Sequence, residues 1–191
     1  MVHAPLISLI FVVTASLGGP VLILGGSTQF PMTLPDLVYL LGKYFALASF
    51  LILTFQYVWT AKFKFLEKLR SYDSRVAVHR TLGTLGILGV TLHPILILVF
   101  YATQGVPLII DLPMAAGFSG LVILLFIIGS TFLGRIWNIR YETWKRLHWL
   151  TFPVLTLAFY HSIQLGSDIY GPLRTTWFIL WGFHLLVVLG K

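Results

Sequence analysis

Four of the six histidines in this 191-residue chain lie in pairs on two long, largely apolar stretches. A histidine is costly in such a setting and usually marks a functional site. His79 and His93 are separated by about four helical turns, and His148 and His161 by slightly less. Imidazole ligates transition metals and also relays protons. The spacing therefore predicts two long segments, each with one histidine near each of its ends that could serve as a metal ligand or a proton carrier.

The remaining composition narrows this chemistry to imidazole ligation. The chain has no cysteine, which excludes disulfides, iron–sulfur clusters, thiol catalysis and covalently attached c-type haem. A zinc site or a proton pathway would need acidic partners nearby. We expect every carboxylate to lie in a loop or at the end of a span: Asp36, Glu67, Asp73, Asp111, Glu142 and Asp168.

The elements that position the histidines are predicted to be membrane-spanning helices. Hydrophobic residues make up 58% of the chain and charged residues 10%, which predicts an integral membrane protein with little mass outside the bilayer. The N-terminus lacks the basic region of a signal peptide. We expect an all-α bundle of six transmembrane helices forming a single domain over 1–191, with spans at 5–25, 35–59, 76–101, 113–135, 147–166 and 172–190.

The distribution of basic residues predicts the orientation of these spans. The formal net charge is +7, but the basic residues concentrate in two short loops, so they indicate topology and not nucleic-acid binding. The positive-inside rule then places both termini in the cytoplasm, in a multi-pass protein of the plasma membrane. The loop residues are Lys62, Lys64, Lys68, Arg70 and Arg75 after the second span, and Arg135, Arg140, Lys145 and Arg146 after the fourth.

With this topology the histidines form two level pairs. Spans three and five run in the same direction, so His79 and His148 share one depth, and His93 and His161 share another about 20 Å away. A level pair can hold a planar haem from both faces, and two axial imidazoles leave the iron no open position. Two such haems would carry electrons across the bilayer.

Two details bear on the haem interpretation. Gly83 and Gly86 share the face of His79 and His93, where they leave room for a macrocycle or, alternatively, for helix packing. On one ideal helix His148 and His161 would point about 140° apart. We expect Pro153, between them, to kink or retwist the span.

The four-histidine pattern resembles a known family. His-x13-His on span three, His-x12-His on span five, and the segments HRTLG (79–83) and RYETWKRLH (140–148) are similar to the ferric reductase-like transmembrane domain. That group includes ferric reductases, NADPH oxidases and the haem subunit of a bacterial methionine sulfoxide reductase system. The resemblance implies two haem b groups, the inner ligated by His79 and His148 and the outer by His93 and His161. It also implies FAD and NAD(P)H on a cytoplasmic partner protein or on a further domain.

Supporting residues are expected around the haems, with no residue assigned a catalytic role. Lys43 on span two either pairs with a propionate of the outer haem or reaches to the outer headgroups. Arg80 and Arg174 either pair with propionates or anchor the chain at the two interfaces. His184 is expected to be a packing or hydrogen-bonding residue. In NADPH oxidases a further histidine often lies one turn beyond the outer ligand, and Ile97 stands there.

Three functions compete at this level. The first is a transmembrane electron-transfer oxidoreductase that takes electrons from a cytoplasmic flavin reductase and passes them to an outer acceptor such as ferric iron, oxygen or a partner protein. The second is a quinone-linked cytochrome b that anchors a larger redox complex. The third is a haem-free helical scaffold or transporter.

Overall fold

The computed structural model describes residues 18–20, 32–60, 71–134 and 136–189. Every regular element in these ranges is an α-helix, which confirms the all-α prediction. Most of the first predicted span, 5–25, lies outside the described residues. The chain divides into two compact units, Met1–Leu108 and Ile109–Lys191, each described here by itself.

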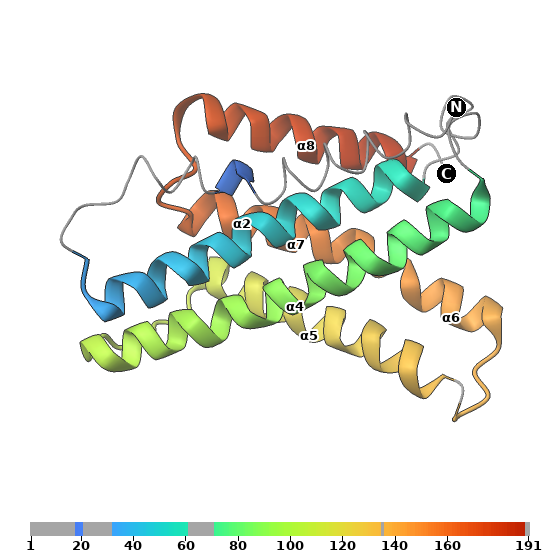
Figure 1. Ribbon diagram of the computed structural model, residues 1–191, viewed down its shortest axis with the longest axis horizontal. Coiled ribbons are helices and arrows are strands. Elements are labelled where there is room, and N and C mark those ends of the chain that lie inside the picture. The colour runs from blue at the N-terminus through green and yellow to red at the C-terminus, as the bar shows by residue number, and fades with distance from the viewer. Residues whose placement is uncertain (1–17, 21–31, 61–70, 135, 190–191) are drawn as a thin grey trace. The chain divides into compact units, whose positions relative to one another are not determined.

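The first unit is built on a pair of long helices. α2 (Leu34–Thr60) and α4 (Tyr72–Gln104) lie side by side and run antiparallel (Figure 1). The start of α4 is capped by the Ser71 hydroxyl, which accepts from the Ser74 N–H at 3.4 Å. Its end is capped by Gly105, whose φ of 63° lies in the left-handed region that glycine adopts without strain.

Small residues bring α2 and α4 close together. A Cβ added at Gly86 would lie 3.0 Å from the Leu53 side chain, and Gly89 faces the Ser49 hydroxyl and the backbone of Phe45. Gly86 therefore serves helix packing, as small residues do in membrane bundles. Of the two roles that the sequence left open for Gly86, helix packing is the one that fits, because side chains of α2 fill the space beside it.

The second unit contains α5 (Leu112–Leu133), α6 (Tyr141–His148), α7 (Thr151–Leu165) and α8 (Gly171–Leu189). α5 packs mainly on α7. α7 also meets α8 through aromatic residues: the rings of Phe159 and Trp181 stack with centroids 4.8 Å apart. Trp177 Nε1 donates to the Ser162 hydroxyl at 3.1 Å. These contacts fix α7 between two neighbours.

Among the described residues, three helices are long and apolar enough to cross a membrane: Leu34–Tyr57 of α2, α4 and α5. Residues 173–189 of α8 form a shorter apolar helix. α4 carries a row of exposed apolar side chains, Leu85, Leu88, Leu92, Ile95 and Val99. Burying such a row in lipid removes it from water. The chain is an integral membrane protein.

The fifth predicted span, 147–166, is not one helix. α6 ends at His148 and α7 begins at Thr151. Pro153 has no N–H to donate to the carbonyl of Trp149. That carbonyl instead accepts from the Phe152 N–H at 3.0 Å, and the Thr151 hydroxyl donates to the His148 carbonyl at 2.8 Å. The tightened turn ends one helix and starts the next, so the wide angle expected between the two rings on a continuous helix does not apply.

Candidate functional site

The two histidines of α4 both face α2. His79 and His93 are half-buried, and each approaches a residue of the neighbouring helix: Gln56 near the end of α2 and Gly42 near its start. Gly42 and Gln56 are as far apart along the chain as the two histidines are. Because the helices are antiparallel, one register matches both pairs. The separation along each helix is about 21 Å.

His93 is held by a backbone carbonyl. Its Nδ1 lies 3.0 Å from the Gly42 oxygen. A carbonyl oxygen accepts and never donates, so Nδ1 carries the proton and Nε2 keeps a lone pair. A hydrogen bond of this kind fixes the ring of most metal-ligating histidines. A Cβ at Gly42 would lie 2.9 Å from Ile97, so the glycine allows the close approach that the bond needs.

His161 of α7 is held in the same way by α5. Its Nδ1 lies 3.0 Å from the carbonyl oxygen of Pro113. One turn further along α5, a Cβ at Gly117 would come within 2.6 Å of this nitrogen. The missing side chain at Gly117 is therefore what lets the ring reach the carbonyl. His161, like His93, presents Nε2 as a lone-pair donor.

His79 is held by a side chain. The amide of Gln56 lies 2.6 Å from His79 Nδ1, and its other end lies 3.0 Å from the Gly83 nitrogen. Gln56 is buried, with 6% of its surface exposed. A polar side chain buried at the end of an apolar helix needs such partners. Its second partner, Gly83, has no atom within 4 Å of an added Cβ, so open space lies beside His79.

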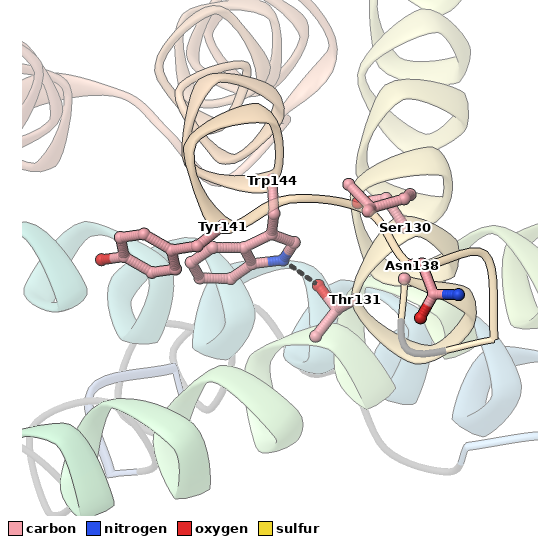
Figure 2. Close-up of a pocket in the computed structure, with 7 residues that line it drawn as sticks. Ser130, Thr131, Asn138, Tyr141 and Trp144 are labelled. Carbon is pink, nitrogen blue, oxygen red and sulfur yellow. Dashed lines mark hydrogen bonds between the residues drawn. The ribbon is translucent and has the colours of Figure 1, made fainter.

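His148 ends an aromatic ladder on α6. Its ring stacks on Trp144, with centroids 5.1 Å apart, and Trp144 stacks on Tyr141 at 5.8 Å. The indole Nε1 of Trp144 donates to the hydroxyl of Thr131 on α5 at 3.0 Å (Figure 2). α5 thereby holds the short helix and the histidine at its end.

An open hollow adjoins this hydrogen bond. It encloses about 570 Å³, and Figure 2 draws the residues around it. The lining combines aromatic rings with hydroxyl and amide groups: Ser130, Thr131, Gly134, Asn138, Ile139, Tyr141 and Trp144.

Each unit thus carries one histidine toward either end of a helix. In the first unit, His79 lies beside the last turns of α2 and His93 beside its first turns. In the second, His161 contacts the start of α5, and His148 is tied through Trp144 to the last turns of α5. Ligation at two levels would require each unit to carry one histidine toward each end of a helix, and both units meet this requirement.

The donor set suits a haem better than a bare metal ion. In the described part of the chain, no group of three or more His, Asp or Glu side chains could hold a metal ion. A haem takes at most two ligands from the protein, because the macrocycle supplies the other four nitrogens. His93 and His161, whose Nδ1 atoms donate to backbone carbonyls, fit that requirement, and the space at Gly83 gives room beside His79.

The other expected site residues lie as follows. Lys43, half-buried and next to Gly42, places its Nζ 5.1 Å from the ring centroid of Tyr39. Arg80 on α4 and Arg174 in the first turn of α8 are exposed. His184 on α8 is 1% exposed and its ring lies 5.8 Å from that of Phe152, which agrees with a packing role.

Sequence reasoning missed the partners that orient the rings. Gln56 carried a usable signal, because it is a polar residue in an apolar span. Its spacing from Gly42 also repeats the spacing of the α4 histidines. Pro113 and Gly117 carried none, because the contact depends on how α5 packs against α7.

Comparisons with known proteins bear on these residues. A family model described as "Ferric reductase like transmembrane component" matches residues 45–159, more than half of the chain. The match includes His79, His93 and His148 and ends two residues before His161. Searches of curated proteins and of solved structures returned no match. With helices apolar enough to cross a membrane and histidines held by their neighbours, the chain belongs to the ferric reductase-like transmembrane component family.

Proposed function

We propose that this chain is a di-haem b cytochrome that passes electrons across a bilayer. His79 and His148 ligate an inner haem, and His93 and His161 ligate an outer one. The observation that carries the proposal is the hydrogen bonding of His93 and His161: a backbone carbonyl 3.0 Å from Nδ1 leaves Nε2 of each ring as the ligand. A bound haem supplies a reversible one-electron couple between ferric and ferrous iron.

The proposed topology has six spans and cytoplasmic termini. Support comes from the three long apolar helices α2, α4 and α5 and from the shorter apolar α8. The basic residues of α6, Lys145 and Arg146, lie in its last turn beside His148. A basic segment at that end belongs on the cytoplasmic side by the positive-inside rule. His148 is then an inner ligand, and His161, at the opposite end of α5, is an outer one.

The ligand set determines how electrons enter and leave. With two imidazoles holding each haem, the iron would have no open position, and acceptors would receive electrons without binding to it. A flavin reductase on the cytoplasmic side, carrying FAD and using NAD(P)H, is the proposed donor. The acceptor lies on the outer side and is ferric iron, oxygen or a partner protein. The chain's own residues hold the ligand rings, exclude water and set the distance between the two levels.

A quinone-linked cytochrome b that anchors a larger complex is the alternative function. The hollow beside Trp144 favours it, because aromatic rings with Ser130 and Asn138 nearby suit a quinone headgroup. Quinone retained by the purified protein, displaced by a quinone-site inhibitor and lost in Asn138→Leu, would support this alternative over direct reduction of an outer acceptor.

The test of the main proposal is haem stoichiometry on purified protein. A pyridine haemochrome assay should give two haem b per chain, with low-spin absorption bands. His93→Ala and His161→Ala should each leave one, and His184→Gln, which changes a buried histidine outside the proposed ligand set, should leave two. A wild-type chain without haem would mean that the protein is a haem-free scaffold or transporter.

Vesicles test the direction of transfer. Reconstituted protein with a reductant inside should reduce an impermeant ferric chelate outside. Transfer that persists in protein lacking either haem would contradict the relay.

A further inference from the structure

The partner of His79 differs in kind from the partners of His93 and His161. The carbonyls of Gly42 and Pro113 can only accept a hydrogen bond, so they fix the proton on Nδ1. The Gln56 amide offers both an acceptor oxygen and a donor NH₂ group. It therefore permits both tautomers of the His79 ring.

The two orientations of the Gln56 amide have opposite consequences. With NH₂ toward His79, it donates to Nδ1 at 2.6 Å and to the His79 carbonyl at 3.3 Å, and its oxygen accepts from the Gly83 N–H at 3.0 Å. This arrangement needs a lone pair on Nδ1 and puts the ring proton on Nε2. With oxygen toward His79, Oε1 accepts from Nδ1–H, and the lone pair of the ring lies on Nε2, the atom that would ligate iron.

The two orientations of the Gln56 amide satisfy different numbers of hydrogen bonds. The NH₂-inward orientation satisfies three contacts in the haem-free chain. The oxygen-inward orientation places NH₂ against the Gly83 N–H and oxygen against the His79 carbonyl, so it gives up two of them. Iron ligation through Nε2 requires the second orientation and must offset that loss.

We propose that Gln56 is a positioning residue for the inner haem: its amide turns its oxygen toward His79 Nδ1 when Nε2 ligates iron, and it thereby sets the donor strength of that ligand. The inference rests on the proposed function, since it assumes that His79 is a haem ligand. At the proposed outer site, His93 and His161 are instead held by backbone carbonyls, which cannot turn as an amide can.

The proposal predicts opposite effects from two substitutions. Gln56→Glu provides a carboxylate acceptor, which makes the imidazole more basic and favours ferric iron. Gln56→Leu removes the acceptor, which makes the imidazole a weaker donor and favours ferrous iron. The inner midpoint potential should therefore fall in the first variant and rise in the second. A tenfold change in the reduction equilibrium corresponds to about 59 mV for one electron.

The experiment is a redox titration of the haem-loaded chain with optical and EPR detection. The matched control is Thr54→Val, which changes another buried polar residue of α2, whose hydroxyl donates to the Phe50 carbonyl of its own helix. One of two titrating components should shift, in opposite directions in the two Gln56 variants, and it should be the component that His79→Ala removes. One low-spin EPR signal should change with it.

The possible outcomes distinguish the role of Gln56 from the proposed di-haem function on which it rests. Two haems in the wild type, with unchanged potentials or shifts of the same sign in both variants, would overturn the role of Gln56 and leave the cytochrome intact. A wild-type chain without haem would overturn both. If Gln56→Leu does not fold, the isosteric Gln56→Glu decides alone: a lower potential in the His79 component supports the role, and an unchanged one rejects it.

Discussion

Gly42 accepts a hydrogen bond from Nδ1 of His93, 51 positions further along the chain, at 3.0 Å. The bond joins the first turns of α2 to the second half of α4. It depends on a residue without a side chain, because a Cβ at Gly42 would lie 2.9 Å from Ile97 Cδ1 and 3.3 Å from Leu96 Cβ. The position of the His93 ring is therefore sensitive to the size of residue 42.

Gly42→Val should weaken haem binding at the outer level and leave the inner level intact. The added side chain pushes Ile97 and α4 away, which breaks the bond to His93. Loss of such a supporting hydrogen bond typically costs about 10- to 100-fold in metal affinity. Haem retained per chain after extensive washing measures the effect. Gly129→Ala on α5 is the control, because a Cβ added there meets no atom of the described residues within 4 Å, those of the proposed ligands included. Equal haem loss in both variants would contradict the prediction.

Gly117 and Gly120 of α5 offer a second matched pair. A Cβ at Gly117 would lie 2.6 Å from His161 Nδ1, whereas one at Gly120 would lie an ordinary 3.5 Å from Leu157. Gly117→Ala should therefore displace His161 and lower outer-haem affinity by about 10- to 100-fold. Gly120→Ala should retain both haems. The measurement is the haemochrome ratio for each variant, and full retention in Gly117→Ala would show that the His161 ring is not a ligand in this pose.

Much of the helical framework was predictable, because apolar runs long enough for a bilayer fix where helices lie. The predicted span 35–59 corresponds to α2 (Leu34–Thr60), and 113–135 to α5 (Leu112–Leu133). A distortion at Pro153 was expected, and the structure shows a break between α6 and α7 just before it. That the distortion is a full break was not predictable, because it depends on the bond from the Thr151 hydroxyl to the His148 carbonyl.

The histidines could be selected from sequence, but their supports could not. The pairing of His79 with Gln56 depends on the register of α2 against α4. That register is set by packing at Gly86 and Gly89, where side chains of α2 fill the space that a Cβ would occupy. The matching spacing of Gly42 and Gln56 on α2 indicates which residues could pair with the histidines, but the pairing itself depends on that register.

Electron transfer to the outside should stop in His93→Ala and in His161→Ala. Each variant lacks an outer ligand, while His79 and the α6 ladder that ends at His148 are unchanged. The remaining haem should still be reduced from the cytoplasmic side. Stopped-flow absorption in vesicles with internal reductant measures both steps. Reduction of an external acceptor at the wild-type rate in either variant would reverse the proposed order.

Trp144→Phe should weaken the binding of the inner haem without removing a proposed ligand. The substitution keeps an aromatic ring against His148 and loses the hydrogen bond to Thr131, worth about 0.5–1.5 kcal/mol. We expect lower retention of the inner haem on heating. Trp149→Phe is the control, because Trp149 is 52% exposed and its ring contacts Phe152 edge-on at 6.1 Å. The same thermal loss of haem in both variants would argue against a role for the bond between α5 and α6.

Lys43→Met should keep both haems and lower the potential of the outer one. Lys43 follows Gly42 directly, so it lies at the level of His93 in the first unit, with its Nζ 5.1 Å from the Tyr39 ring. A charge within an apolar span costs on the order of 2.5–3.5 kcal/mol, and the cation–π contact offsets about 0.5–2 kcal/mol of it. Anionic propionates of an outer haem at this level would stabilise the charge further. A cation beside a haem also favours its electron-rich ferrous form. Removing this cation should shift the midpoint potential of the outer haem downward by a few tens of millivolts, given about 59 mV per tenfold change.

A redox titration of Lys43→Met measures this shift. Two controls accompany it: Lys43→Arg, which keeps the charge, and Lys145→Met, which removes an exposed lysine from α6. Unchanged potentials in Lys43→Met would mean that this lysine reaches to the headgroups and has no electrostatic role at the outer haem.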